Sequence, residues 1–184
     1  MKTETMDILE TFELIVDTRE QRTSRAKRRF ASFTAPHQHS VMSYGDYCAN
    51  VTLPSGEKLY DASAAVTAMC VIERKMSLDE LAGNLTRGRD RFRREFEKAQ
   101  EAGATVYLLV EDGSWDKILK HEYRSKFTPE AFFASLTAWQ ARYDLRIIFC
   151  PHTITAKLIQ EILYRDMKER LENGEIGNGR PKEV

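Results

Sequence analysis

The sequence has little cysteine and no long apolar run. Its three cysteines lie far apart and form no Cys-x-x-Cys pair, which excludes a disulfide-stapled scaffold or a cysteine-rich zinc site and is typical of a reducing compartment. No apolar run reaches the ~18 residues that a membrane-spanning helix needs. The N-terminal sequence MKTETMDILETFE is acidic where a secretory signal would be basic and then apolar. We therefore expect an intracellular, cytoplasmic protein with no membrane partner.

Internal repeats and low-complexity linkers are also missing. A chain of 184 residues with 42% hydrophobic residues can fill one core of ordinary size but not two substantial ones. We therefore predict a single domain over residues 10–172, with flexible termini at 1–9 and 173–184.

The chain has no net charge, with 28 basic and 28 acidic residues, but the charges are unevenly distributed. Residues 19–29 hold six basic residues against one acid, and residues 87–98 hold six against three. If both stretches share a face, they form a local surface that attracts phosphate. The alternative is two solvated charged faces without a partner.

The hydrophobic pattern predicts strands followed by alternating helices and strands. Residues 12–17, 41–53 and 58–75 are typical of strands joined by turns, with a loop at 34–40. Ser77 and Glu80 form a capping box that begins a helix continuing to Gly103. Further along, strands are expected at 106–110 and 146–150, and helices at 129–143 and 153–171. The order predicts an α/β fold whose mixed central sheet, an antiparallel meander plus parallel crossovers, is flanked by helices.

Acidic residues stand at the ends of the first strands. Asp17 closes one strand, Asp46 lies in the next, and Glu73 is near the end of the third. Carboxylates brought together require a cation, and hard divalent ions prefer oxygen ligands. Lys75 lies two residues after Glu73 and therefore points to the same face of its strand. This set suits phosphodiester hydrolysis, although acids on a solvated surface would give the same pattern.

The residues around these acids resemble the nuclease signature of the XPF/Hef family of structure-specific DNA endonucleases. The matching segments are Val16-Asp17-Thr18-Arg19-Glu20, Gly45-Asp46-Tyr47 and Ile72-Glu73-Arg74-Lys75 with Asp79 four residues on. The resemblance covers residues 12–170 and implies a restriction-endonuclease-like core. Branched or duplex DNA is then the expected substrate, in repair or recombination. The tandem helix-hairpin-helix module that often follows this domain is not expected here, so a separate partner could supply that grip on DNA.

The resemblance also implies a role for each matching residue. It assigns the binding of Mg²⁺ or Mn²⁺ to Asp46, Glu73 and Asp17, and catalysis to the same three residues together with Lys75 and Glu20. It assigns DNA contact to Arg19, Arg74 and Arg89. Gly45 and Asp79 are implied to support the motif structurally. Independently, Arg89 falls within the apolar stripe of its predicted helix, so it either points inward at an anion or reaches out to water.

Alternatives stay open for the function, for two histidines and for the last helix. A non-catalytic DNA-binding or scaffold member of the same fold is the main rival to an enzyme. His37 and His39 could bind a metal, but exposed loop histidines are the simpler interpretation. Apolar residues cover more than one face of the last helix, from Ile154 to Met167, which predicts a homodimer through the C-terminal helices.

Overall fold

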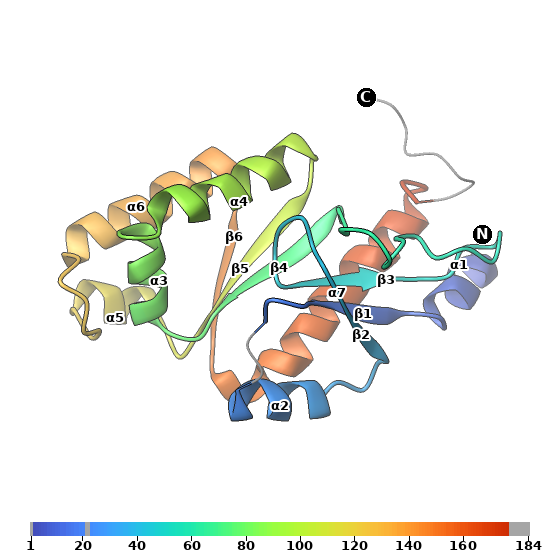
Figure 1. Ribbon diagram of the computed structural model, residues 1–184, viewed down its shortest axis with the longest axis horizontal. Helices are drawn as coiled ribbons and strands as arrows, with labels where there is room; N and C mark the ends of the chain where they lie inside the picture. Colours follow the sequence, from blue (N-terminus) through green and yellow to red (C-terminus); the bar gives the residue numbers. More distant parts are fainter. Residues whose placement is uncertain (1, 21–22, 177–184) are drawn as a thin grey trace. The chain divides into compact units, whose positions relative to one another are not determined.

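A computed structural model describes residues 2–20 and 23–176 (Figure 1). The chain divides into two compact units. Unit 1 comprises Met1–Met42, Tyr47–Ala68 and Ala156–Val184, and unit 2 comprises Ser43–Asp46 and Met69–Thr155. The end of the predicted C-terminal tail, 177–184, lies outside the described residues.

Three strands and three helices lie in the described part of unit 1. Their bounds are α1 Lys2–Leu9, β1 Glu13–Asp17, α2 Ser24–Ala31, β2 His37–Ser40, β3 Tyr47–Asn50 and α7 Thr155–Glu172. Strand β1 pairs in parallel with β2 and antiparallel with β3. It lies between the other two and its residues Leu14, Ile15 and Val16 are fully buried. The continuous apolar run at 12–17 therefore marks a strand covered on both faces, as the sequence predicts. Helix α1 occupies the segment that the sequence assigned to a terminus outside the domain.

Strand β2 was not foreseen, because residues 34–40 were expected to form a loop. The sequence HQHS has no alternation of apolar and polar residues. Its strand conformation comes from parallel pairing with β1, in which Val16 lies opposite His39 and Asp17 opposite Ser40. The predicted strand at 41–53 is also shorter, since only Tyr47–Asn50 has strand geometry.

Helix α7 buries a narrower face than its apolar residues suggested. The buried apolar positions follow the spacing of one helical stripe and are Ala156, Ile159, Leu163, Met167 and Leu171. Of the other apolar positions, Ile154 is 46% exposed and precedes the helix. None of the helices in the described ranges is both long and apolar enough to span a membrane.

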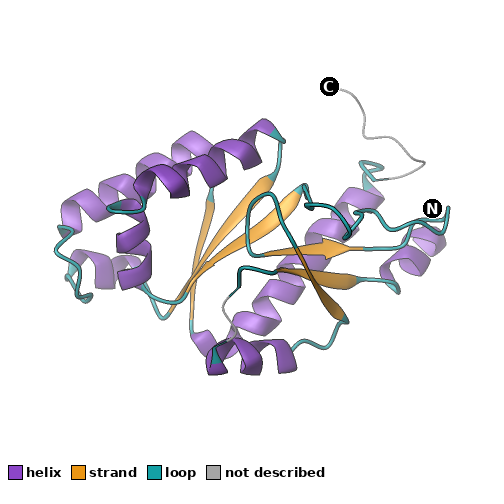
Figure 2. Cartoon of the chain, in the orientation of Figure 1, coloured by secondary structure: helices purple, strands orange, loops and turns teal. Residues whose placement is uncertain are grey.

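Unit 2 is built on three parallel strands with helices between them (Figure 2). The bounds are β4 Cys70–Lys75, α3 Leu78–Leu85, α4 Arg89–Glu101, β5 Thr105–Glu111, α5 Trp115–Leu119, α6 Pro129–Tyr143, β6 Arg146–Cys150 and the 3-10 helix η1 His152–Ile154. Strand β5 pairs with both β4 and β6. The parallel crossovers expected for this half of the chain are confirmed.

Aromatic side chains from α4 and α6 fill the core beside these strands. The ring centroids of Phe92 and Phe96 lie 5.5 and 5.6 Å from that of Trp139, and all three side chains are buried. Thr128 caps α6 by accepting a hydrogen bond from the Ala131 amide, as the Thr-Pro-Glu sequence predicts. The buried aromatic side chain of Trp139 on α6 is therefore part of the core.

The single helix predicted from Ser77 to Gly103 is wrong, because the chain breaks between α3 and α4. The Thr86 hydroxyl donates to the Ala82 carbonyl oxygen at 2.7 Å, and the Gly88 amide donates to the Gly83 carbonyl oxygen at 3.0 Å. These bonds satisfy the end of α3 without continuing the regular ladder. The apolar spacing runs through the break, so periodicity alone did not reveal it.

Candidate active site

Asp46 is held beside β4 by two backbone hydrogen bonds. Its amide donates to the Ile72 carbonyl oxygen at 2.8 Å, and its Oδ2 accepts from the Arg74 amide at 2.7 Å. The residue lies in the loop just before β3 and not within a strand, which corrects the sequence interpretation. The turn depends on Gly45, whose φ of +74° is a conformation that side-chain-bearing residues rarely adopt.

Gly45→Ala is expected to destabilise the protein more than Gly56→Ala. Both glycines have positive φ, at +74° and +86°, so both alanines carry a similar backbone strain of roughly 1–2 kcal/mol. Only at Gly45 does the added Cβ meet a neighbour, Val71 Cβ at 2.7 Å, whereas nothing lies within 4 Å at Gly56. Urea denaturation should show about 1–3 kcal/mol of additional loss for Gly45→Ala. Equal losses in the two variants would contradict this account of the turn.

Glu73 and Lys75 point to the same face of β4 and are bonded to each other. Lys75 Nζ lies 2.6 Å from Glu73 Oε1 and 4.7 Å from the centroid of the Phe92 ring, and both charged side chains are buried. Burial alone would lower the pKa of Lys75, but the negative charges of Glu73 and Asp46 and the hydrogen bond to Glu73 outweigh it and raise that pKa. Lys75 is therefore held as an ammonium cation.

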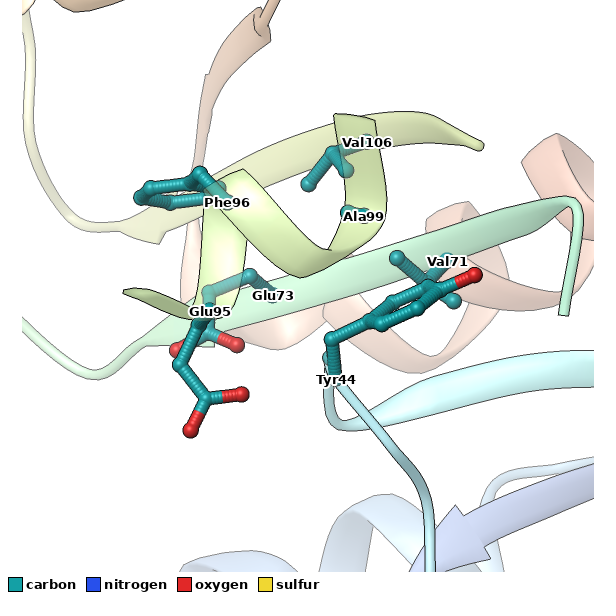
Figure 3. A pocket seen from close by; sticks show the side chains of 8 residues that line it. Tyr44, Val71, Glu73, Glu95, Phe96, Ala99 and Val106 are labelled. Carbon is teal, nitrogen blue, oxygen red and sulfur yellow. The ribbon is translucent and has the colours of Figure 1, made fainter. Parts of the chain in front are cut away.

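A small recess lies beside Glu73 (Figure 3). It is lined by residues of the Asp46 loop, β4, α4 and β5, including Tyr44, Gly45, Val71, Glu73 and Glu95. Glu95 comes from α4, and its side chain reaches the same recess as Glu73 (Figure 3). Sequence reasoning counted Glu95 only as one charge in a basic stretch. Its position three residues after Phe92, on the same side of the helix, was the available signal.

Arg74 was expected to contact DNA, but the structure buries it. Its side chain is 11% exposed, and Nη1 lies 3.4 Å from Oε2 of Glu111, which is 1% exposed. This contact joins β4 to β5 on the face opposite Lys75, because successive side chains of a strand alternate. Arg74 thus supports the strand that carries Glu73 and Lys75, and it is not a surface cation.

Asp79 anchors the loop between α5 and α6. Its Oδ1 accepts from the amides of Arg124 at 2.6 Å and Ser125 at 3.2 Å, and its Oδ2 accepts from Arg124 Nε at 3.0 Å. Partial burial would raise the pKa of Asp79, but these bonds and the Arg124 charge outweigh it and lower that pKa. The motif residue predicted to support the site structurally thus contacts a segment 45 residues away.

The lowered pKa of Asp79 predicts a loss of stability in acid that Asp79→Asn should reduce. Because the folded pKa lies below the unfolded value of about 3.9, the stabilisation is complete above that pH and is lost as pH falls through the folded pKa. Urea denaturation from pH 7 down to pH 3 should give a shallower acid slope for Asp79→Asn than for the unaltered protein. Identical slopes would mean that the bonds to Arg124 and Ser125 contribute nothing.

Asp17 is fully engaged by neighbours within unit 1. Its two oxygens accept from the Arg19 amide at 2.6 Å, Arg19 Nε at 2.9 Å, Arg19 Nη2 at 2.8 Å and the Met42 amide at 3.0 Å. A carboxylate offers about four acceptor positions, so all of them are used. Arg19, predicted to bind DNA, remains 56% exposed while it makes this contact.

Glu20 forms a buried ion pair within unit 1. Its carboxylate accepts from Arg29 Nη2, and the two side chains are 5% and 4% exposed. Arg29 Nε also donates to the Tyr47 hydroxyl oxygen at 2.9 Å. This pairing ties α2 to β3, so Glu20 has a structural role that the sequence did not suggest.

The Arg89 side chain contacts the end of α3 and the Trp139 ring. It is exposed at the start of α4, where Nη1 donates to the Leu85 carbonyl oxygen at 3.2 Å and Cζ lies 5.3 Å from the Trp139 ring centroid. The apolar stripe expected around Arg89 requires one continuous helix, and the break at 86–88 interrupts that helix. The side chain is exposed, and its contact with DNA stays a prediction.

A divalent metal fits the carboxylates of unit 2. Mg²⁺ keeps several waters and is commonly held by one or two protein carboxylates, which Asp46 and Glu73 can supply. Across the described ranges, no group of three or more His, Cys, Asp or Glu side chains could hold a metal ion. Asp17, the predicted third ligand, could bind a metal only if Arg19 and Met42 released it.

Comparison with known proteins identifies the class of fold and then the family. XPF from Aeropyrum pernix is similar, with a TM-score of 0.58 and 19% identity over 89% of this chain and 69% of that one. XPF from Aeropyrum pernix in complex with DNA gives a TM-score of 0.54 and 18% identity over 92% and 69%. Curated proteins gave no match. The architecture is therefore the mixed α/β nuclease fold of XPF, which confirms the predicted restriction-endonuclease-like core.

Residues 16–162 match the family model of the ERCC4 domain. The chain belongs to the ERCC4 domain family. The match covers both halves of the nuclease signature, from Val16 to Asp79, and confirms the XPF-type resemblance drawn from those residues. This family contains DNA nucleases, so the protein is a member of a DNA nuclease family.

Proposed function

We propose that this protein is a metal-dependent endonuclease that hydrolyses phosphodiester bonds in DNA, with branched or structured DNA as its preferred substrate. The observation that carries the proposal is the grouping of Asp46, Glu73 and Lys75 at β4. Glu73 and Lys75 belong to β4, and Asp46 is hydrogen-bonded to the backbone of the same strand, so two carboxylates and a buried ammonium cation meet within unit 2. The chain that carries them belongs to the ERCC4 domain family. Membership of the family alone would also allow a non-catalytic subunit.

The two carboxylates and the lysine of this group would have different tasks. Asp46 and Glu73 would hold Mg²⁺ or Mn²⁺, which when bound lowers the pKa of a coordinated water and stabilises charge on the phosphate. Lys75 places a fixed positive charge beside them and helps to hold the attacking water near phosphorus. Its hydrogen bond to Glu73 and its contact with Phe92 hold the ammonium group in one place. The expected products carry 5′-phosphate and 3′-hydroxyl ends.

DNA binding would use exposed basic residues that contact phosphates. Arg19 is half exposed, and Lys27 and Arg28 are exposed on α2. Phosphate contacts fix the position of a protein on DNA but do not distinguish bases, so the shape of the DNA would decide where it is cut. The solved XPF in complex with DNA supports this part of the proposal.

A homodimer through the C-terminal helices remains a proposal. The apolar face of α7 is wide in sequence, but most of that face is buried or half-buried in one chain. What supports a dimer is therefore the family resemblance and not an exposed apolar surface. Sedimentation over a range of protein concentrations would test it.

Cleavage of a panel of branched and linear DNAs at low salt tests the proposed activity. With Mn²⁺ we expect cuts near the branch point, and with EDTA we expect none. Protein that binds the same DNAs but cuts none of them in Mn²⁺ would identify the non-catalytic alternative. Titration calorimetry with Mn²⁺ on the protein alone tests for an unrelated function. A protein whose acidic residues lie on a solvated surface is expected to bind no Mn²⁺.

A further inference from the structure

Helix α2 and strand β2 together carry rings and positive charges that the proposed catalytic group does not use. Residues 23–45 contain no Asp or Glu. Within this stretch four rings, Phe30, Phe33, His37 and His39, contact one another, and we refer to them as the ring patch. The two phenylalanines are half-buried, and the two histidines are exposed.

Strand geometry places both histidines on one face of β2. Their ring centroids are 6.3 Å apart, and the intervening Gln38 points to the other face, where Nε2 donates to Glu13 Oε1 at 3.0 Å. On the histidine side, His37 lies 5.5 Å from Phe33 and His39 lies 5.4 Å from Phe30. The rings form a continuous surface from a helix to the outer strand of unit 1.

Buried polar contacts hold this surface from below. The guanidinium carbon of Arg29 lies 5.6 Å from the Phe30 centroid and 5.8 Å from the Tyr47 centroid. Arg29 is in turn fixed by Glu20 and by the Tyr47 hydroxyl. Because the supporting side chains are buried and paired, the rings lose little further conformational freedom when a ligand binds.

Cations flank the rings on the same helix. Lys27 and Arg28 are exposed and Arg25 is half-buried, while the side chain of Arg29 is neutralised by Glu20. Exposed rings bordered by cations match the two parts of a nucleic acid strand, since bases stack on rings and phosphates pair with cations. In a duplex the faces of the bases are covered by neighbouring base pairs, so the rings would have nothing to contact.

We propose that the ring patch binds unpaired bases of a single DNA strand, and that Lys27 and Arg28 bind its phosphates. This inference rests on the proposed function, because it names the part of a branched substrate that unit 1 would engage. His39 of the ring patch lies next to the C-terminal end of β1, where the following residue, Ser40, is in register with Asp17. A branched DNA would then be distinguished from a plain duplex by the unpaired strand at its branch.

Binding of labelled oligo-dT and of a hairpin duplex, measured by fluorescence anisotropy in EDTA, tests this proposal. For the double variant His37→Ala/His39→Ala we expect affinity for oligo-dT to fall at least about fivefold, as loss of base stacking predicts, with duplex affinity unchanged. The variant Lys27→Ala/Arg28→Ala should weaken binding to both DNAs and reduce the salt dependence. Lys157→Ala, which removes an exposed lysine on α7, is the matched control and should change neither.

Replacement by tyrosine distinguishes stacking from metal binding. His37→Tyr/His39→Tyr keeps two rings but loses the imidazole nitrogens, so it should bind oligo-dT within about twofold of the unaltered protein if stacking is the mechanism. Failure of this variant, or unchanged oligo-dT affinity in the alanine pair, would overturn the proposal. Since EDTA prevents metal-dependent cleavage, these results are independent of the cleavage panel. Binding to oligo-dT without cleavage of any DNA would reject the endonuclease and retain the ring patch.

Discussion

Asp46→Asn is expected to abolish metal-dependent cleavage of branched DNA while leaving the fold intact. The asparagine side-chain oxygen can still accept the hydrogen bond from the Arg74 amide, which in the unaltered protein is 2.7 Å from Oδ2. The negative charge that would bind the metal is lost. A bound metal supplies several kcal/mol of transition-state stabilisation, so the cleavage rate should fall by at least about a hundredfold. Single-turnover cleavage in Mn²⁺, with circular dichroism as the check on folding, measures this.

Asp61→Asn is the matched control for this experiment. Asp61 also accepts a backbone hydrogen bond, from the Ser63 amide at 2.9 Å, but it lies in an exposed turn of unit 1. The same chemical change there should leave cleavage unaltered. If Asp46→Asn protein cuts DNA as fast as Asp61→Asn protein, the metal site has been placed wrongly.

Arg29→Ala is expected to lower the free energy of unfolding by about 3–5 kcal/mol. The substitution leaves the Glu20 carboxylate, which is 5% exposed, buried without its cation, and it also removes the donor to the Tyr47 hydroxyl. An uncompensated buried charge costs far more than a lost surface contact. Urea denaturation at pH 7 provides the measurement.

Two further variants show whether the ion pair is the cause. Arg28→Ala removes the neighbouring exposed arginine and should change stability by less than about 0.5 kcal/mol. Adding Glu20→Leu to Arg29→Met should recover much of the loss, because no charge is then left buried. A similar loss for Arg28→Ala and Arg29→Ala would show that Glu20 does not depend on its partner. Cleavage by the stable double variant would also show whether Glu20 takes part in catalysis.

The parts of the site that could be predicted are those that depend on residues close together in the sequence. Glu73 and Lys75 share a face because side chains alternate along a strand, and this holds wherever the strand lies. The two-sided burial of β1 follows from its continuous apolar run. Recognition of Asp46 required the family signature, because no local pattern relates it to Glu73.

The rest depends on contacts between distant segments. The partners of Asp79 are 45 residues away, and Glu111 reaches Arg74 from the neighbouring strand. The saturation of Asp17 depends on the Met42 amide, 25 residues on. Strand β2 forms because β1 offers it a partner, although its own sequence has no strand pattern. In each case the local sequence is compatible with several partners, and only tertiary packing selects one.

The break between α3 and α4 matters because of the relative lengths of helices and strands. A continuous helix from Leu78 to Glu101 would be about 36 Å long at 1.5 Å per residue. The six residues of β4 span only about 20 Å, so much of such a helix would extend past the strands and leave its apolar side in water. With the turn at 86–88, the two shorter helices of unit 2 run in different directions (Figure 1). The same turn brings Phe92 back onto Lys75, so an interruption in a helix determines what surrounds the ammonium group.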